Sequence, residues 1–230
     1  HNEAVPVDDT AHERLLPRLR SYQNAFGFSW NRDVMDTQLK AEVERLDPTR
    51  PVVRSSGEIT LPPLHEGTDA HTYFGWYSAF GTLAFGELLL DLFPGNLRFV
   101  TEFGAQSFPN LESCLRFMPE HLDEATISRL EEHHGFQGTI MSRWIPWRAA
   151  PDLAAVIQLS QEYQSYINRH FIDRLRFSKY RPTGGIVPFL FVDPFPAILW
   201  SVVDYWRVPK GSYYALQTAF SPQYAFTILA

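Results

Sequence analysis

Short apolar segments alternate with helical segments along almost the whole chain, and this alternation constrains the fold more than any other feature. The apolar segments are rich in β-branched and aromatic residues and end at small or polar residues, which is typical of buried strands. The expected strands are 50–57, 71–77, 97–102 and 186–192. The expected helices are 9–46 with a break near Gly27, 78–92, short helices within 111–134, 151–178 and 209–220, and we expect residues 139–150 to form a loop. Strands that alternate with helices predict an α/β fold with a parallel sheet.

Polar, aromatic and glycine residues gather directly after the expected strands. In a (β/α)8 barrel the carboxyl ends of the strands carry the functional residues. About four full strands and the end of one more are present, which is half of such a barrel. We therefore expect the C-terminal half of a (β/α)8 TIM barrel, from the end of strand four through helix eight, incomplete on its own. We expect this partial barrel to span residues 1–220, and residues 221–230 to begin a β-sandwich domain or a linker.

The composition excludes several classes of protein. The 230 residues are 45% hydrophobic and 20% charged, so the chain can bury a core. Its net charge is −6 and it has no basic run, which argues against a nucleic-acid or anionic-membrane partner. Cys114 is the single cysteine, which excludes an internal disulfide and a cysteine-based zinc site. The most apolar stretch, 184–203, contains Asp193 and three prolines, so we expect no membrane span there.

One of the apolar strands ends in a carboxylate. Glu102 closes the strand 97–102 and is followed by Gly104, which permits a tight exit from the strand. A carboxylate in that setting costs free energy unless it has polar partners or a chemical role. A second carboxylate, Glu3, follows Asn2 at the start of the sequence. Two carboxylates at one mouth of a barrel indicate glycoside hydrolysis, which needs a proton donor for the leaving oxygen and a carboxylate on the other face of the sugar.

The aromatic strand 71–77 can place the hydroxyl of Tyr73 beside a carboxylate. The same region holds a group of residue types that can bind metals, namely His65, Glu66, Asp69 and His71. Only His71 lies on an expected strand, and the loop positions of the others are typical of a solvated surface. We therefore expect neither a metal nor another cofactor.

Over nearly all of its length, the chain resembles the C-terminal half of the catalytic barrel of glycoside hydrolase family 2. The family includes β-galactosidases, β-glucuronidases and β-mannosidases. The resemblance rests on motifs in the family's order and spacing: His1-Asn2-Glu3, Asp47-Pro-Thr-Arg-Pro51, Asp69 to Tyr77, Phe99 to Pro109, Arg181-Pro-Thr-Gly-Gly185 and Trp200 to Lys210.

The resemblance implies a role for each matched polar residue. Glu3 matches the general acid/base that ends strand four, and Asn2 matches the residue that bonds the sugar 2-hydroxyl. Glu102 matches the nucleophile that ends strand seven. Tyr73 matches the tyrosine that donates a hydrogen bond to the nucleophile and keeps it ionised. In such retaining enzymes the two carboxyl groups lie about 5–5.5 Å apart.

The resemblance also implies residues that contact the substrate. His71 and Trp76 lie on the strand that carries Tyr73, and we expect both to contribute to sugar binding. Many members carry a tryptophan platform in Trp-x-x-x-Asp, whereas this chain has Phe189 in the tryptophan position. Trp200 lies a loop later and can supply the platform; the alternative, that Trp200 is buried support for the barrel rim, is equally open.

The motifs also bear on which sugar is bound. The stretch 200–210 lacks the Asn-x-Lys element with which glucuronidases grip a carboxylate, and Glu102 to Pro109 is most similar to the β-mannosidase branch. The resemblance thus implies a retaining exo-β-glycosidase, most similar to a β-mannosidase, with a β-galactosidase as an alternative. The rival from another class is a non-catalytic carbohydrate-binding fragment. The expected partners are a carbohydrate substrate and the N-terminal half of the same polypeptide, without which we expect residues 1–230 to be inactive.

Overall fold

The computed structural model describes residues 28, 30–54, 56–57, 70–77 and 81–227, and these residues divide into two units. The first unit holds residues up to Glu102 together with Tyr180–Gly185, and the second holds Phe103–Lys179 and the chain from Ile186 onward. Each unit is described by itself. Asn2 and Glu3 lie outside the described residues, as does the part of the expected 9–46 helix before residue 28.

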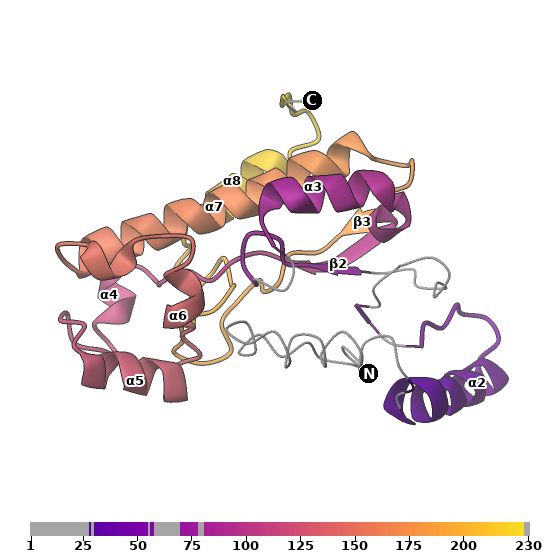
Figure 1. Cartoon of the computed structure of the whole chain (residues 1–230), viewed down its shortest axis with the longest axis horizontal. Helices are drawn as coiled ribbons and strands as arrows, with labels where there is room; N and C mark the ends of the chain where they lie inside the picture. The colour runs from indigo at the N-terminus through magenta and orange to yellow at the C-terminus, as the bar shows by residue number, and fades with distance from the viewer. Residues whose placement is uncertain (1–27, 29, 55, 58–69, 78–80, 228–230) are drawn as a thin grey trace. The chain divides into compact units, whose positions relative to one another are not determined.

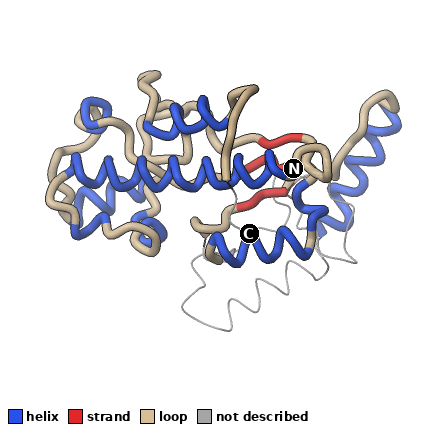
Figure 2. The backbone as a smooth tube through the Cα atoms, turned by 90° about the horizontal axis from the view of Figure 1, so that it is seen from above, coloured by secondary structure: helices blue, strands red, loops and turns tan. Residues whose placement is uncertain are grey.

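The first unit contains the described helices and strands up to residue 102. These are the π-helix η2 (Trp30–Met35), α2 (Asp36–Leu46), β1 (Ala70–Thr72), α3 (Leu83–Leu92), the 3-10 helix η3 (Pro94–Leu97) and β2 (Phe99–Phe103). The strands form a three-stranded parallel sheet in the order β1-β2-β3, in which β3 is Gly185–Ile186 (Figure 2). The expected α/β class with a parallel sheet is therefore confirmed.

Backbone geometry explains where β1 ends. All three of its residues are buried, as expected of a strand inside an α/β unit. The expected strand 71–77 is too long, because the chain turns at Gly75, whose φ of +78° is a left-handed conformation that glycine adopts easily. The amide of Gly75 donates to the carbonyl of Gly81 at 2.8 Å, which closes the turn. Tyr73 therefore lies directly after the strand.

The second unit is mainly helical. It contains α4 (Leu111–Cys114), α5 (Glu124–His133), α6 (Gly138–Met141), the 3-10 helix η4 (Trp147–Ala149), α7 (Leu153–Phe177) and α8 (Gly211–Ala219). Asp152 caps α7 by accepting a hydrogen bond from the amide of Ala155 at 2.8 Å. The long helix α7 packs side by side with α8 (Figure 1). None of the described helices combines the length and apolarity that crossing a bilayer requires.

Three further expectations from the sequence are corrected. Residues 50–54 form no strand in the structure. Strand β3 has two residues in place of the expected 186–192, because Pro188 has no amide proton to donate to a ladder. Residues 139–150 are not a plain loop, since they include most of α6 and all of η4, where the buried Trp147 donates from its indole nitrogen to the carbonyl of Gly138 at 3.1 Å.

A stripe of polar side chains runs along the buried side of α7. Ser160, Gln164 and Asn168 recur every fourth residue, so they lie on one face of the helix, and all three are buried. This face meets the irregular chain that follows β2. Ser160 accepts a hydrogen bond from the amide of Phe108 at 3.1 Å, and a Cβ added to Gly104 would lie 3.1 Å from Asn168 Oδ1.

Gln164 makes the largest number of contacts in this stripe. Its Nε2 donates to three main-chain carbonyls, those of Ala105 (2.9 Å), Trp200 (3.0 Å) and Ser201 (3.2 Å). Its Oε1 accepts from the hydroxyls of Ser107 (2.7 Å) and Ser212 (2.5 Å). One side chain therefore joins the chain after β2, the loop around Trp200 and the start of α8.

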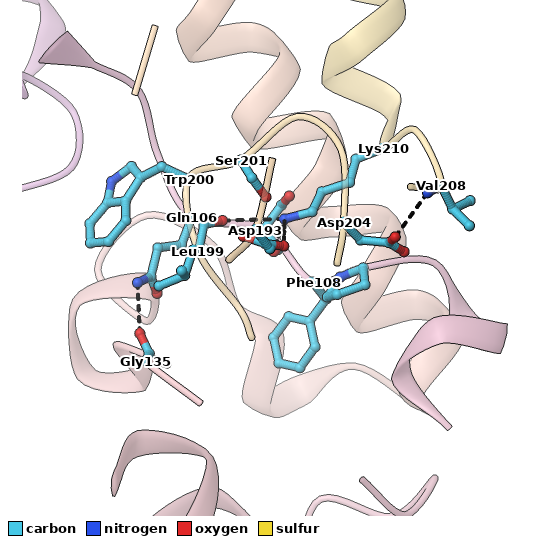
Figure 3. Close-up of polar contacts among 12 residues, drawn as sticks. Gln106, Phe108, Gly135, Asp193, Leu199, Trp200, Ser201, Asp204, Val208 and Lys210 are labelled. Atoms are coloured by element: carbon cyan, nitrogen blue, oxygen red, sulfur yellow. Dashed lines mark hydrogen bonds and ion pairs between the residues drawn. The ribbon is translucent and has the colours of Figure 1, made fainter. Parts of the chain in front are cut away.

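A buried ion pair reinforces the same loops. Lys210 is fully buried, and its Nζ lies 3.5 Å from Asp193 Oδ2 (Figure 3). The same ammonium donates to the carbonyls of Ser107 at 3.1 Å and Leu199 at 3.3 Å. Burial lowers the pKa of Lys210 and raises the pKa of Asp193, and the attraction between the two groups opposes both shifts. The pair thus holds two irregular segments, around Ser107 and Leu199, against each other.

The sequence predicts that a β-sandwich domain or a linker begins at residue 221. Residues 221–227 form no helix or strand, and residues 228–230 lie outside the described residues. That a domain or linker begins here stays a prediction.

We expect Gln164→Leu to destabilise the second unit strongly. The substitution leaves buried carbonyls and hydroxyls without a partner, which costs about 2–3 kcal/mol, and for a domain of this size it should lower the Tm by roughly 5–10 °C. The control is Gln158→Leu on the exposed side of the same helix, where the lost hydrogen bond to Glu162 is solvent-exposed and the Tm should barely move. Equal Tm values for the two variants would contradict the proposed role of Gln164.

Candidate active site

Glu102 lies near the end of β2, and two polar side chains from the end of β1 reach its carboxylate. The hydroxyl of Tyr73 donates to Glu102 Oε2 at 2.8 Å. The Nδ1 atom of His71 lies 3.4 Å from the same oxygen. The side chains of His71 and Tyr73 meet one carboxylate because β1 and β2 are neighbours in the sheet and the two residues are two positions apart. The contact between Tyr73 and Glu102 that the resemblance implies is present.

Burial strengthens the electrostatics of this cluster. The side chain of Glu102 is 14% exposed and that of His71 is 2% exposed. A hydrogen bond donated to a carboxylate favours its charged form, and the effect is larger where water is scarce. The Glu102 carboxylate is therefore partly open to solvent and has two polar side chains at one oxygen, an arrangement suited to a nucleophile or a binding group.

Ser56 and Gly57 complete the cluster, although the sequence pattern predicted no role for either residue. Ser56 Oγ lies 3.2 Å from His71 Nε2 and 3.4 Å from Thr101 Oγ1. Gly57 has a φ of +77° and lies against the His71 ring, so a Cβ added there would be 2.6 Å from Nδ1. In the sequence, these two residues are visible only as small residues at the end of the apolar run 50–57. This pattern does not predict which side chain they contact.

The two tryptophans that we expect to contact the substrate lie in different units. Trp76 is fully buried in the first unit. Trp200 belongs to the second unit, where it is 8% exposed and its ring lies edge-on to Phe189, with the ring centroids 5.8 Å apart. Phe189 and Trp200 therefore form one aromatic pair. Trp76 and Trp200 are both buried, as is typical of side chains that pack in the interior. Sugar contact by Trp76 or Trp200 stays a prediction.

The partner carboxylate of the expected mechanism is Glu3, which lies outside the described residues together with Asn2. The expected carboxyl separation of about 5–5.5 Å therefore stays a prediction.

Of the candidate metal ligands, His65, Glu66 and Asp69 lie outside the described residues, so the expectation of no metal stays a prediction. Among the residues that the structure describes, no group of three or more His, Cys, Asp or Glu side chains is arranged to hold a metal ion. Burial raises the pKa of the Cys114 thiol to about 12, so at neutral pH this group is a protonated thiol and a poor nucleophile.

Comparison with known proteins gives consistent sequence relatives, although no family model matches the chain. Beta-mannosidase B of Aspergillus niger is 29% identical over 173 residues, which cover 72% of this chain and 20% of that protein. Beta-mannosidase B of Aspergillus oryzae is 27% identical over 202 residues, which cover 83% of this chain and 23% of that protein. The chain thus spans about a fifth of the length of these relatives.

Solved structures show the same fold. The β-D-mannosidase of Dictyoglomus thermophilum matches 92% of this chain with a TM-score of 0.62 and 22% identity, and the match covers 28% of that structure. The β-glucuronidase 2 of Bacteroides uniformis matches 96% of this chain with a TM-score of 0.50 and 17% identity, covering 23% of that structure. The chain is thus similar in sequence to β-mannosidases and shares its fold with the β-D-mannosidase structure.

Proposed function

We propose that the protein carrying this chain is a retaining exo-β-glycosidase that removes terminal β-linked mannose. The observation that carries the proposal is the Glu102 carboxylate at the end of β2, with Tyr73 and His71 both on its Oε2 atom. The named sequence relatives are β-mannosidases, which supports mannose over the alternative of a β-galactoside. The alternative from another class is a non-catalytic carbohydrate-binding fragment, which turnover of an aryl β-mannoside by the complete protein would exclude.

The proposed reaction is a double displacement. In the first step Glu102 attacks the anomeric carbon and forms a glycosyl ester, while Glu3 gives its proton to the departing glycosidic oxygen. In the second step Glu3 takes a proton from water, the water oxygen bonds to the anomeric carbon, and Glu102 leaves as a carboxylate. Asn2 bonds the sugar 2-hydroxyl, a contact that tightens as the transition state forms.

Tyr73 has a defined part in both steps. Its hydroxyl points at the oxygen whose charge disappears when the ester forms and returns when the ester breaks. A donor already in place lowers the cost of that returning charge because it needs no reorganisation at the moment of reaction.

We expect Glu102→Gln to abolish hydrolysis while leaving the fold intact. The amide has nearly the same shape but lacks the negative charge that attacks the anomeric carbon, so kcat/KM for an aryl β-mannoside should fall by several orders of magnitude. The control is Glu112→Gln, which changes an exposed carboxylate whose partner is Arg116 and should leave kcat/KM unchanged. Near-normal turnover by Glu102→Gln would place the nucleophile elsewhere.

Tyr73→Phe should slow the same reaction by a smaller factor. It removes one hydrogen bond to a charged group, worth about 1.5–3 kcal/mol, which corresponds to roughly a 10- to 150-fold loss in kcat/KM. Tyr214→Phe, at an exposed position on α8, removes a hydroxyl of the same kind away from the cluster and serves as the control. If both variants keep wild-type kinetics, the Tyr73 hydroxyl has no part in the reaction.

A further inference from the structure

His71 is held on three sides by residues from different parts of the first unit. Glu102 Oε2 lies 3.4 Å from its Nδ1, and Ser56 Oγ lies 3.2 Å from its Nε2. Gly57 covers the flat face of the ring, because a Cβ added there would lie 2.6 Å from Nδ1 and 2.7 Å from both Cγ and Cε1. Similar distances to three ring atoms mean that the Cβ position lies over the face of the imidazole.

Gly57 meets two independent requirements at once. Its φ of +77° lies in the left-handed region that L side chains rarely adopt. The missing side chain also leaves room for the His71 ring, which a Cβ at this position would overlap. The turn formed by Ser56 and Gly57, which we name the His71 clamp, therefore fixes both the position of the ring and the partner of Nε2.

The clamp is compatible with a proton on Nδ1. A hydroxyl can donate or accept, so Ser56 matches either state of Nε2. In the neutral imidazole, the carboxylate of Glu102 beside Nδ1 favours the tautomer with the proton on Nδ1, and Ser56 then donates to Nε2. When the imidazole is charged, Nε2 donates to Ser56 Oγ, which lies 3.4 Å from Thr101 Oγ1. In both states the protonated Nδ1 lies 3.4 Å from Glu102 Oε2.

We infer that the His71 clamp makes His71 a positioning residue for Glu102, which orients the carboxylate for attack together with Tyr73. The inference rests on the proposed function of Glu102 as the nucleophile. A second partner on Oε2 fixes the rotation of the carboxylate about its last bond, which a single hydrogen bond leaves partly open. With its side chain only 2% exposed, His71 acts through Glu102 and not through direct contact with the sugar.

The test uses the complete protein that carries this chain. It measures separately how fast Glu102 attacks the anomeric carbon and how tightly the sugar binds. An activated 2-deoxy-2-fluoro-mannosyl fluoride is the probe, because it traps the glycosyl ester and gives both a trapping rate constant and an inactivator dissociation constant. The trapping rate constant is a first-order property of folded molecules, so a variant that is merely less stable leaves it unchanged. The variants are Ser56→Ala, Ser56→Thr and His71→Leu.

We expect the trapping rate constant to fall about 3- to 10-fold in Ser56→Ala, as the loss of one neutral hydrogen bond implies. His71→Leu should lose about 10- to 100-fold, because it removes the partner of the carboxylate itself. Ser56→Thr keeps the hydroxyl and should remain close to the wild type. The inactivator dissociation constant should stay within about twofold in all three variants, since the sugar contacts are unchanged.

Two results would overturn the inference while leaving the proposed function intact. Unchanged trapping rate constants in Ser56→Ala and His71→Leu would show that the clamp does not act on Glu102. A raised dissociation constant with an unchanged trapping rate constant would assign His71 to direct sugar binding. Glu102→Gln, measured beside them, keeps the two proposals apart: if it is still trapped at the wild-type rate, the proposed nucleophile is wrong and the inference fails with it.

Discussion

The Glu102 carboxylate is the group on which the arrangement of the first unit depends. A charged group near the end of a buried strand is costly unless donors are already in place around it. Tyr73, directly after the neighbouring strand, donates to this carboxylate, His71 lies 3.4 Å from the same oxygen, and Ser56 and Gly57 hold His71 in turn. The turn at Gly75 that shortens β1 is part of the same arrangement, because it leaves Tyr73 directly after the strand.

In the second unit, buried backbone groups also need hydrogen-bond partners. The chain after β2 and the loop around Trp200 are irregular and buried, so their amides and carbonyls need partners other than a sheet ladder. Gln164 supplies partners to three carbonyls, and Lys210 supplies them to two more. These contacts hold the loop around Trp200 and the chain after β2 in one arrangement.

The sequence predicted the parts of this structure that depend on local pattern. The alternation of apolar and helical segments predicted the parallel sheet and the long helix α7 with nearly its observed bounds. Glu102 stood out because a carboxylate at the end of an apolar run is unusual. The motif around Tyr73 predicted its contact with Glu102, which the structure contains.

The parts that escaped prediction depend on contacts between distant residues. The small residues Ser56 and Gly57 have a role only because His71 lies beside them. Polar residues every fourth position on α7 are ordinarily typical of a solvated face, yet Ser160, Gln164 and Asn168 are buried because irregular main chain packs on them. The short β3 follows from Pro188, whose effect on a strand depends on which neighbour requires its amide.

The central claim is that Glu102 is the residue that bonds covalently to the sugar. The most direct measurement is to treat the complete protein with 2-deoxy-2-fluoro-mannosyl fluoride, digest it, and locate the added fluoro-sugar mass by peptide sequencing in a mass spectrometer. The account predicts one label, on Glu102, in the peptide that contains Phe103 and Gly104. A label on any other residue, or turnover of an aryl β-mannoside with no labelled peptide, would contradict it.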